Sequence, residues 1–124
     1  MKLRIKGNSV RLRLMQSEVA TFQKTGKVSE MIDFGTNTLV YQIQKTENDT
    51  IKATFENQTI TVFIPNEIGQ SWANSNQISI ESALLLKGKV LKILVEKDFK
   101  CLTDRPSEDE SDAYPHPKEG SVEC

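Results

Sequence analysis

The stretch VLKILVEKDFKC, from Val90 to Cys101, is the densest apolar run in the sequence and the last one before the composition changes. Its aliphatic and β-branched residues cover a length typical of a strand, and Gly88 interrupts the run just upstream. We interpret this run as a buried strand in the middle of a sheet. Its far end turns polar at Glu96, Lys97 and Asp98.

The composition indicates one soluble domain. The chain has 124 residues, 37% apolar and 27% charged, which is ordinary globular usage and enough for a hydrophobic core. No segment approaches the roughly 18 uninterrupted apolar residues of a membrane span, and the first residues alternate charged and apolar side chains, unlike a secretory signal. We therefore expect a cytoplasmic protein without a membrane partner.

Charge is divided unequally along the chain. Residues 1–100 contain fourteen Lys and Arg against ten Asp and Glu, a balance of +4, whereas residues 101–124 contain two against seven, a balance of −5. We therefore divide the chain into a β-rich body, residues 1–102, and an acidic, proline-containing tail, residues 103–124. The tail is expected to pack on the body and not to form a separate domain.

The N-terminal residues predict a β-hairpin with one cationic face. Apolar and charged residues alternate from Lys2 to Lys6 and from Val10 to Leu14, and the turn sequence Gly7-Asn8-Ser9 separates the two segments. Side chains two residues apart share a face of a strand, so five cations are expected on one face. They are Lys2, Arg4, Lys6, Arg11 and Arg13.

The remaining patterns complete an α+β domain. Ser17 is expected to cap a short helix, and Asn66 a second one with Ile68 and Trp72 on one side. Apolar alternation predicts further short strands, at 28–34, 39–43, 51–55, 60–64 and 78–80. The connections are too short for helical crossovers, so we expect seven to eight mostly antiparallel strands in a curved sheet or a partly closed β-barrel. We find no internal sequence repeat of convincing length.

The cationic face of the hairpin is the main candidate site. Five like charges on one face repel each other, so we expect anions close by. Four interpretations stay open: a solvated outer face, docking of the chain's own acidic tail, a small phosphorylated ligand, and nucleic-acid phosphate. Nucleic acid is disfavoured, because the hairpin has no aromatic residue that would stack on bases.

A second candidate lies where the central strand ends. Glu96, Lys97 and Asp98 are placed to form a sheet rim, and Arg105 is placed to pair with Asp98 or Asp104 and to anchor the tail.

Metal and cofactor sites are disfavoured. The acidic segment EDESDAYPH lacks the ligand order and central glycine of a calcium loop, and the spacing of Cys101, His116 and Cys124 matches no common zinc pattern. We predict free thiols, no catalytic residue, no metal and no cofactor.

The two ends of the chain carry a family resemblance. MKLRIKGNSVRLRLMQSEV at the start and ILVEKDFKCLTDRPSEDESDAYPHP near the end resemble a family of short uncharacterised bacterial proteins, a domain of unknown function, and the likeness covers almost the whole length. The resemblance implies a bacterial cytoplasmic protein and no particular reaction, so no catalytic residue is carried over.

Together these patterns favour a small non-enzymatic binding or interaction module whose basic hairpin and acidic tail face each other, within one chain or between two copies. Its expected partners are a second copy or an anionic ligand. The alternative is an enzyme or binding protein that holds a small anionic or phosphorylated ligand in a β-barrel cavity. The direction of Arg4, Arg11 and Arg13, inward or outward, distinguishes the two.

Overall fold

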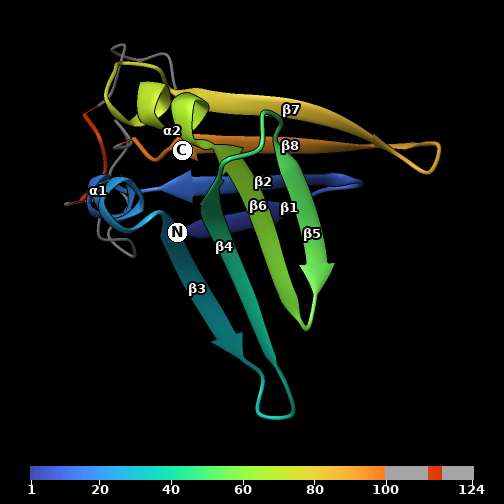
Figure 1. Cartoon of the computed structure of the whole chain (residues 1–124). Coiled ribbons are helices and arrows are strands. Elements are labelled where there is room, and N and C mark those ends of the chain that lie inside the picture. Colours follow the sequence, from blue (N-terminus) through green and yellow to red (C-terminus); the bar gives the residue numbers. More distant parts are fainter. Residues whose placement is uncertain (100–111, 116–124) are drawn as a thin grey trace.

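The computed structural model of the chain describes residues 1–99 and 112–115 (Figure 1). These residues contain eight strands and two helices, which confirms the predicted α+β class. In chain order they are β1 (Lys2–Ile5), β2 (Ser9–Leu14), α1 (Gln16–Thr25), β3 (Lys27–Asp33), β4 (Thr38–Thr46), β5 (Lys52–Glu56), β6 (Thr59–Pro65), α2 (Asn66–Ala73), β7 (Ser79–Leu86) and β8 (Lys89–Lys97).

The strands form two four-stranded sheets (Figure 1). Sheet A has the order β1-β2-β8-β7, and sheet B has the order β3-β4-β6-β5. The central pair of each sheet, β2 with β8 and β4 with β6, is parallel, and the outer pairs are antiparallel hairpins. The predicted central strand is confirmed, since β8 lies between β2 and β7.

The expected single curved sheet or partly closed barrel is wrong. The described residues form two mixed sheets, and each sheet ends in an edge strand on both sides. The short connections do make antiparallel hairpins, as predicted. The parallel pairs join strands that are not consecutive, so they need no short crossover connection, and reasoning from connection lengths did not reveal them.

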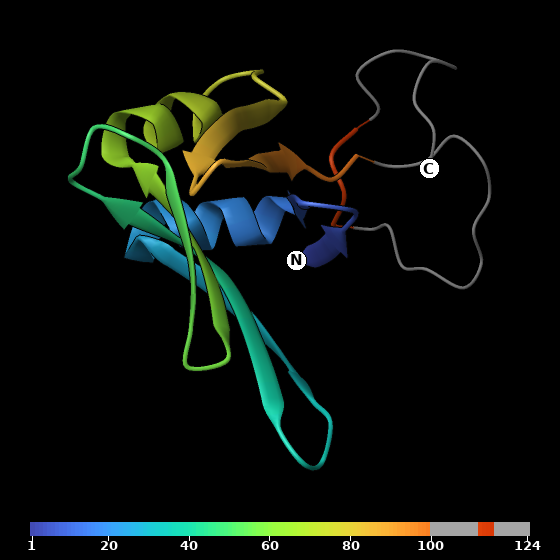
Figure 2. The same ribbon diagram turned by 90° about the vertical axis from the view of Figure 1, so that its right-hand side faces the viewer.

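Both helices lie at the end of the molecule where the two sheets meet (Figure 2). Phe22 of α1 and Trp72 of α2 are fully buried and meet edge to face, with ring centroids 6.3 Å apart. Gly69 permits this close contact, because a Cβ atom at its position would lie 3.0 Å from the Phe22 ring. The glycine that weakens α2 as an isolated helix is therefore required by the packing of the two helices.

The order of elements repeats, although the sequence shows no repeat. A unit of two strands, a helix and two strands occurs first as β1 to β4 with α1 and again as β5 to β8 with α2. Exchanging the two units converts the strand order and pairing of sheet A into those of sheet B. Each position in the β1–β2 hairpin corresponds to the position 50 residues later in the β5–β6 hairpin, as Leu12 does to Val62. Each position in the β3–β4 hairpin corresponds to the position 52 residues later in the β7–β8 hairpin, as Ile43 does to Val95.

Equivalent residues of the two units have equivalent roles in the core. Lys45 Nζ lies 5.6 Å from the centre of the Phe22 ring, and Lys97 Nζ lies 5.8 Å from that of Trp72. Each lysine also donates a hydrogen bond to a backbone carbonyl at or just after the end of the neighbouring helix, at 3.0 and 2.7 Å. The two units thus share a packing scheme, and this gives an internal comparison for residues outside the core.

Candidate functional site

The predicted cationic face of the hairpin is the outer face of sheet A. Leu12 is fully buried, so Arg11 and Arg13 on either side of it point outward, away from the core. The strand register carries this face across the sheet. Arg4 of β1 lies opposite Arg11, and Leu94 of β8 lies opposite Arg11 on the other side.

At one end of this face the cations are neutralised. Lys2 Nζ lies 3.2 Å from Asp98 Oδ2, and Arg13 lies 3.0 Å from Glu96 Oε1 and 3.8 Å from Asp98 Oδ1. Within the described residues the Nε–H of Arg13 is not aligned for a hydrogen bond, so its contact with Glu96 is ionic. Asp98 is 4% exposed, and its backbone N–H donates to Leu14 O at 2.8 Å. The structure thus brings two predicted rim residues, Glu96 and Asp98, onto the predicted cationic face.

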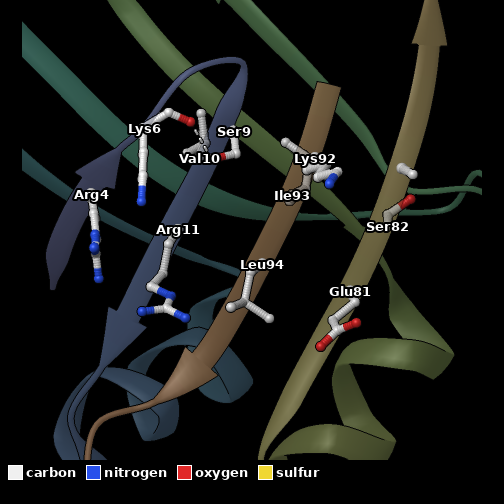
Figure 3. Close-up of a pocket in the computed structure, with 11 residues that line it drawn as sticks. Arg4, Lys6, Ser9, Val10, Arg11, Glu81, Ser82, Lys92, Ile93 and Leu94 are labelled. Atoms are coloured by element: carbon white, nitrogen blue, oxygen red, sulfur yellow. Dashed lines mark hydrogen bonds between the residues drawn. The ribbon is translucent and has the colours of Figure 1, made fainter. Parts of the chain in front are cut away.

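Toward the hairpin turn, the same face has a hollow of about 660 Å³ (Figure 3). Four cationic side chains line it: Arg4, Lys6, Arg11 and Lys92. Within residues 1–99 and 112–115, Arg4, Lys6 and Lys92 form no ion pair. Among the same residues, Arg11 reaches only Glu96, at 3.4 Å, and Glu96 also pairs with Arg13. Positive charge therefore exceeds negative charge among the described residues that line the hollow.

The second unit shows that folding alone does not account for these cations. On the outer face of sheet B, the positions equivalent to the four cations carry uncharged or acidic residues. These are Thr54, Glu56, Thr61 and Val40. The same strand pairs therefore form without cations, whereas in sheet A the directly opposed Arg4 and Arg11 repel each other.

The opposite side of the hollow is formed by β7 and β8. Figure 3 shows Leu94 and Glu81 across the face from Arg11. Glu81 lies opposite Leu94 in the register and is the one carboxylate among the described residues that line the hollow. Ser9, on the hairpin side, donates its hydroxyl hydrogen to Lys6 O at 2.6 Å and so tightens the turn. The site can therefore attract an anion and accept a hydrogen bond from a neighbouring hydroxyl or amine of the same ligand.

Sequence reasoning missed Ser9, Glu81 and Lys92. The alternation of Lys92 with buried Ile93 indicated that this lysine points away from the core. Its place beside the hairpin depends on the parallel pairing of β2 with β8, which sets Ser9 opposite Lys92. No local pattern reveals that pairing.

The described part of the tail packs at the start of α1 and the end of β8. The N–H and hydroxyl groups of Ser17 donate to the Asp112 carboxylate, the N–H at 3.2 Å. Tyr114 N–H donates to Asp98 O at 2.7 Å, and its ring lies 5.5 Å from that of Phe99. The expectation that Ser17 caps the helix is wrong, because Met15 is the N-cap residue and Ser17 is the second residue of α1, with its N–H donated to Asp112. These contacts lie at the neutralised end of the cationic face and not in the hollow.

Lys97 lies in the interior and not on a rim. It is 4% exposed, and its Nζ lies 5.8 and 5.4 Å from the ring centres of Trp72 and Tyr114. Burial lowers the pKa of this ammonium group. The proposed tail anchor Arg105 lies outside the described residues, as do both cysteines and His116.

A separate cluster joins the start of the chain to Glu18, Glu30 and Tyr41. The N-terminal ammonium group of Met1 donates to Glu18 and to Glu30, the latter at 2.9 Å, and Tyr41 donates its hydroxyl hydrogen to Met1 O at 3.0 Å. Burial alone would lower the pKa of the Met1 amine, but the hydrogen bonds that this ammonium group donates to Glu18 and Glu30, together with the negative charges of these residues, outweigh burial and raise the pKa. Burial, with the charges of Glu30 and Glu18, also raises the pKa of Tyr41. The cluster ties the chain start to α1 and β3.

Comparison with known proteins gives one match. A family model described as a family of unknown function (DUF7009) matches residues 1–118. No curated protein and no solved structure matches the chain. Among the described residues, neither helix has the length and apolar character needed to cross a membrane.

Proposed function

Since this chain belongs to DUF7009, a family of unknown function, we propose its function from the site itself: a small, non-enzymatic module that binds a phosphate-bearing anion in the hollow on the outer face of sheet A. The observation that carries the proposal is the unbalanced positive charge of the four lining cations, which has no counterpart on the equivalent face of sheet B.

The lining residues fit a phosphate better than a single carboxylate. Arg4 and Arg11 lie directly opposite each other, so two guanidinium groups converge on the same side of the hairpin. Each guanidinium group can donate two parallel hydrogen bonds to phosphate oxygens, and these charge-assisted bonds are stronger than neutral ones. Lys6 and Lys92 add point charges at the hairpin-turn end of the hollow. Bound phosphate would also remove the repulsion between the arginines.

The hollow lies on the outside of one sheet and not inside a barrel. The arginines therefore do not point into an enclosed cavity, and this weakens the alternative of a ligand held within a β-barrel. The lining groups bind and orient an anion, so the proposal assigns binding and no reaction.

The chain's acidic tail is the internal competitor that we propose for this face. Its support is the position of Asp112 and Tyr114, which return the tail to the body next to Asp98. The replacements Glu108→Gln, Asp109→Asn and Glu110→Gln remove three acidic charges and leave Asp112 in place. Under this proposal they tighten anion binding, and an unchanged affinity would remove the tail from the proposal.

Isothermal titration calorimetry with inorganic tripolyphosphate tests the binding proposal on the full chain. The test variant is Arg4→Thr with Arg11→Thr, because threonine occupies both equivalent positions in sheet B. The control is Lys27→Thr with Lys52→Thr, which removes two exposed cations from the outer face of sheet B.

We expect the test variant to bind at least about tenfold more weakly, since hydrogen bonds to charged groups contribute about 1.5–3 kcal/mol each. The control should keep its affinity, and salt should weaken binding to the wild-type protein. Equal affinity of the two double variants, or no binding by the wild-type protein, would refute the proposal.

A further inference from the structure

The outer face of sheet A is cationic on one side and apolar on the other. Leu94 and Ala83 line the hollow opposite the hairpin. Val90 and Leu85 continue the same face toward the β7–β8 turn, because they alternate with inward-facing residues and lie opposite each other in the register. Val90 is 47% exposed and Leu85 is 75% exposed. An apolar strip therefore begins in the hollow at Leu94 and Ala83, passes Lys92, and continues to Val90 and Leu85 near the β7–β8 turn.

Comparison with the equivalent strands of sheet B shows that most of the apolar strip is not required for folding. Leu94, Val90 and Leu85 correspond to polar residues on the outer face of sheet B. Those residues are Gln42, Thr38 and Asp33, while Ala83 corresponds to Met31. Three of the four apolar positions are thus polar in the equivalent strands. Neither the cations nor most of the strip is required to build the hairpins.

From this juxtaposition we infer that the ligand is an amphiphile, with a phosphate head group and a single apolar chain. The head group lies among Arg4, Arg11 and Lys92, and the chain follows Leu94 toward Val90. This inference rests on the proposed function and adds the chemical class of the ligand. The hollow, at about 660 Å³, is within the usual size of small-molecule sites.

A chain that lies on this strip buries its own methylenes and covers exposed leucine and valine side chains. Each fully buried methylene strengthens binding about fourfold. The strip is open to solvent on one side, so a gain of about twofold per methylene is expected here. A phosphate that binds without using the strip gains nothing from a longer chain.

The experiment is a calorimetric series with inorganic phosphate and with butyl, hexyl and octyl phosphate, all below the concentration at which they form micelles. Affinity should rise along the series for the wild-type protein. The test variant, Leu85→Asn with Val90→Thr, should lose most of this rise and keep its affinity for tripolyphosphate. The control variant, Met31→Asn with Phe34→Thr, replaces apolar residues that are 67% and 66% exposed elsewhere, and it should behave as wild type.

The outcomes separate this inference from the proposed function. Binding of tripolyphosphate with no gain along the alkyl series would overturn the amphiphile and leave the anion site. Failure of all phosphates to bind would overturn both. Binding to phosphatidylglycerol vesicles without binding of monomeric octyl phosphate would also overturn the inference, because the face would then recognise a lipid surface and not a single molecule.

Discussion

Replacing Arg4 by threonine should stabilise the protein at low salt. Arg4 forms no ion pair within the described residues, and it lies opposite Arg11 and two residues from Lys6. Lys6 is about 7 Å away along the strand, and Arg11 is about 5 Å away across the strand pair. At these distances Lys6 repels Arg4 by about 0.6 kcal/mol in water and Arg11 by about 0.8 kcal/mol, so the two together contribute about 1.4 kcal/mol.

Salt determines how much of this repulsion is felt. At 10 mM salt the screening length is about 30 Å, and most of the repulsion, about 1 kcal/mol, remains. At 1 M salt the screening length is about 3 Å, and about a tenth remains. Arg4→Thr should therefore raise the free energy of unfolding by about 1 kcal/mol at 10 mM NaCl, equivalent to about 3–5 °C in Tm, and by almost nothing at 1 M NaCl.

Urea unfolding followed by fluorescence measures this effect, because the chain has one tryptophan and Trp72 is fully buried. Lys52→Thr is the control, since Lys52 lies opposite Phe63 and not opposite a cation, and it should change stability by less than about 0.5 kcal/mol at either salt concentration. A variant of Arg4 that is less stable than wild type at 10 mM NaCl, or a gain that persists at 1 M, would refute the repulsion reasoning.

Three further predictions concern the contacts around the site and the core. Asp98→Asn should lower the free energy of unfolding by about 2 kcal/mol, because the partly buried Arg13 loses a carboxylate partner; a loss below about 0.5 kcal/mol in urea unfolding would contradict this. Glu18→Gln tests the contact between the charged Met1 amine and Glu18, which raises the pKa of that amine. The contribution of this contact to the free energy of unfolding is complete below about pH 8, and it disappears as the pH rises through the raised pKa. The wild-type protein should thus lose more stability than the variant above pH 8, and parallel pH profiles would argue against the contact. Gly69→Ala should destabilise the fold by about 1–2 kcal/mol in thermal unfolding, since overpacking outweighs the gain in helix propensity, and an increase in Tm would show that the helices can separate without penalty.

Part of the candidate site followed from local pattern. The alternation of Lys2 to Lys6 and Val10 to Leu14 predicted a hairpin with its cations on one face, and the structure has that hairpin, with Arg4 opposite Arg11. Apolar density likewise identified β8 as a central strand. These features depend on side chains that are two residues apart, so a single sequence contains the information.

The hollow itself did not follow from local pattern. Lys92 and Glu81 reach the hairpin only because β2 pairs in parallel with β8 and β8 with β7. The hydrogen bond from Ser17 to Asp112 joins residues 95 positions apart in the same way. Such contacts depend on which distant strands meet, and a single sequence contains no signal for that choice.

The structural repeat of the two units is a further feature that the sequence did not reveal. Phe22 and Trp72, or Leu12 and Val62, are equivalent in the core, but they share size and apolar character and not identity, so the sequence shows no repeat. By itself the sequence determined the hairpins, the helices and the cationic face of the first hairpin, because those depend on neighbours along the chain. Only the tertiary structure decided that two hairpins from opposite ends of the chain share one sheet, because that pairing is selected by burial of the whole core.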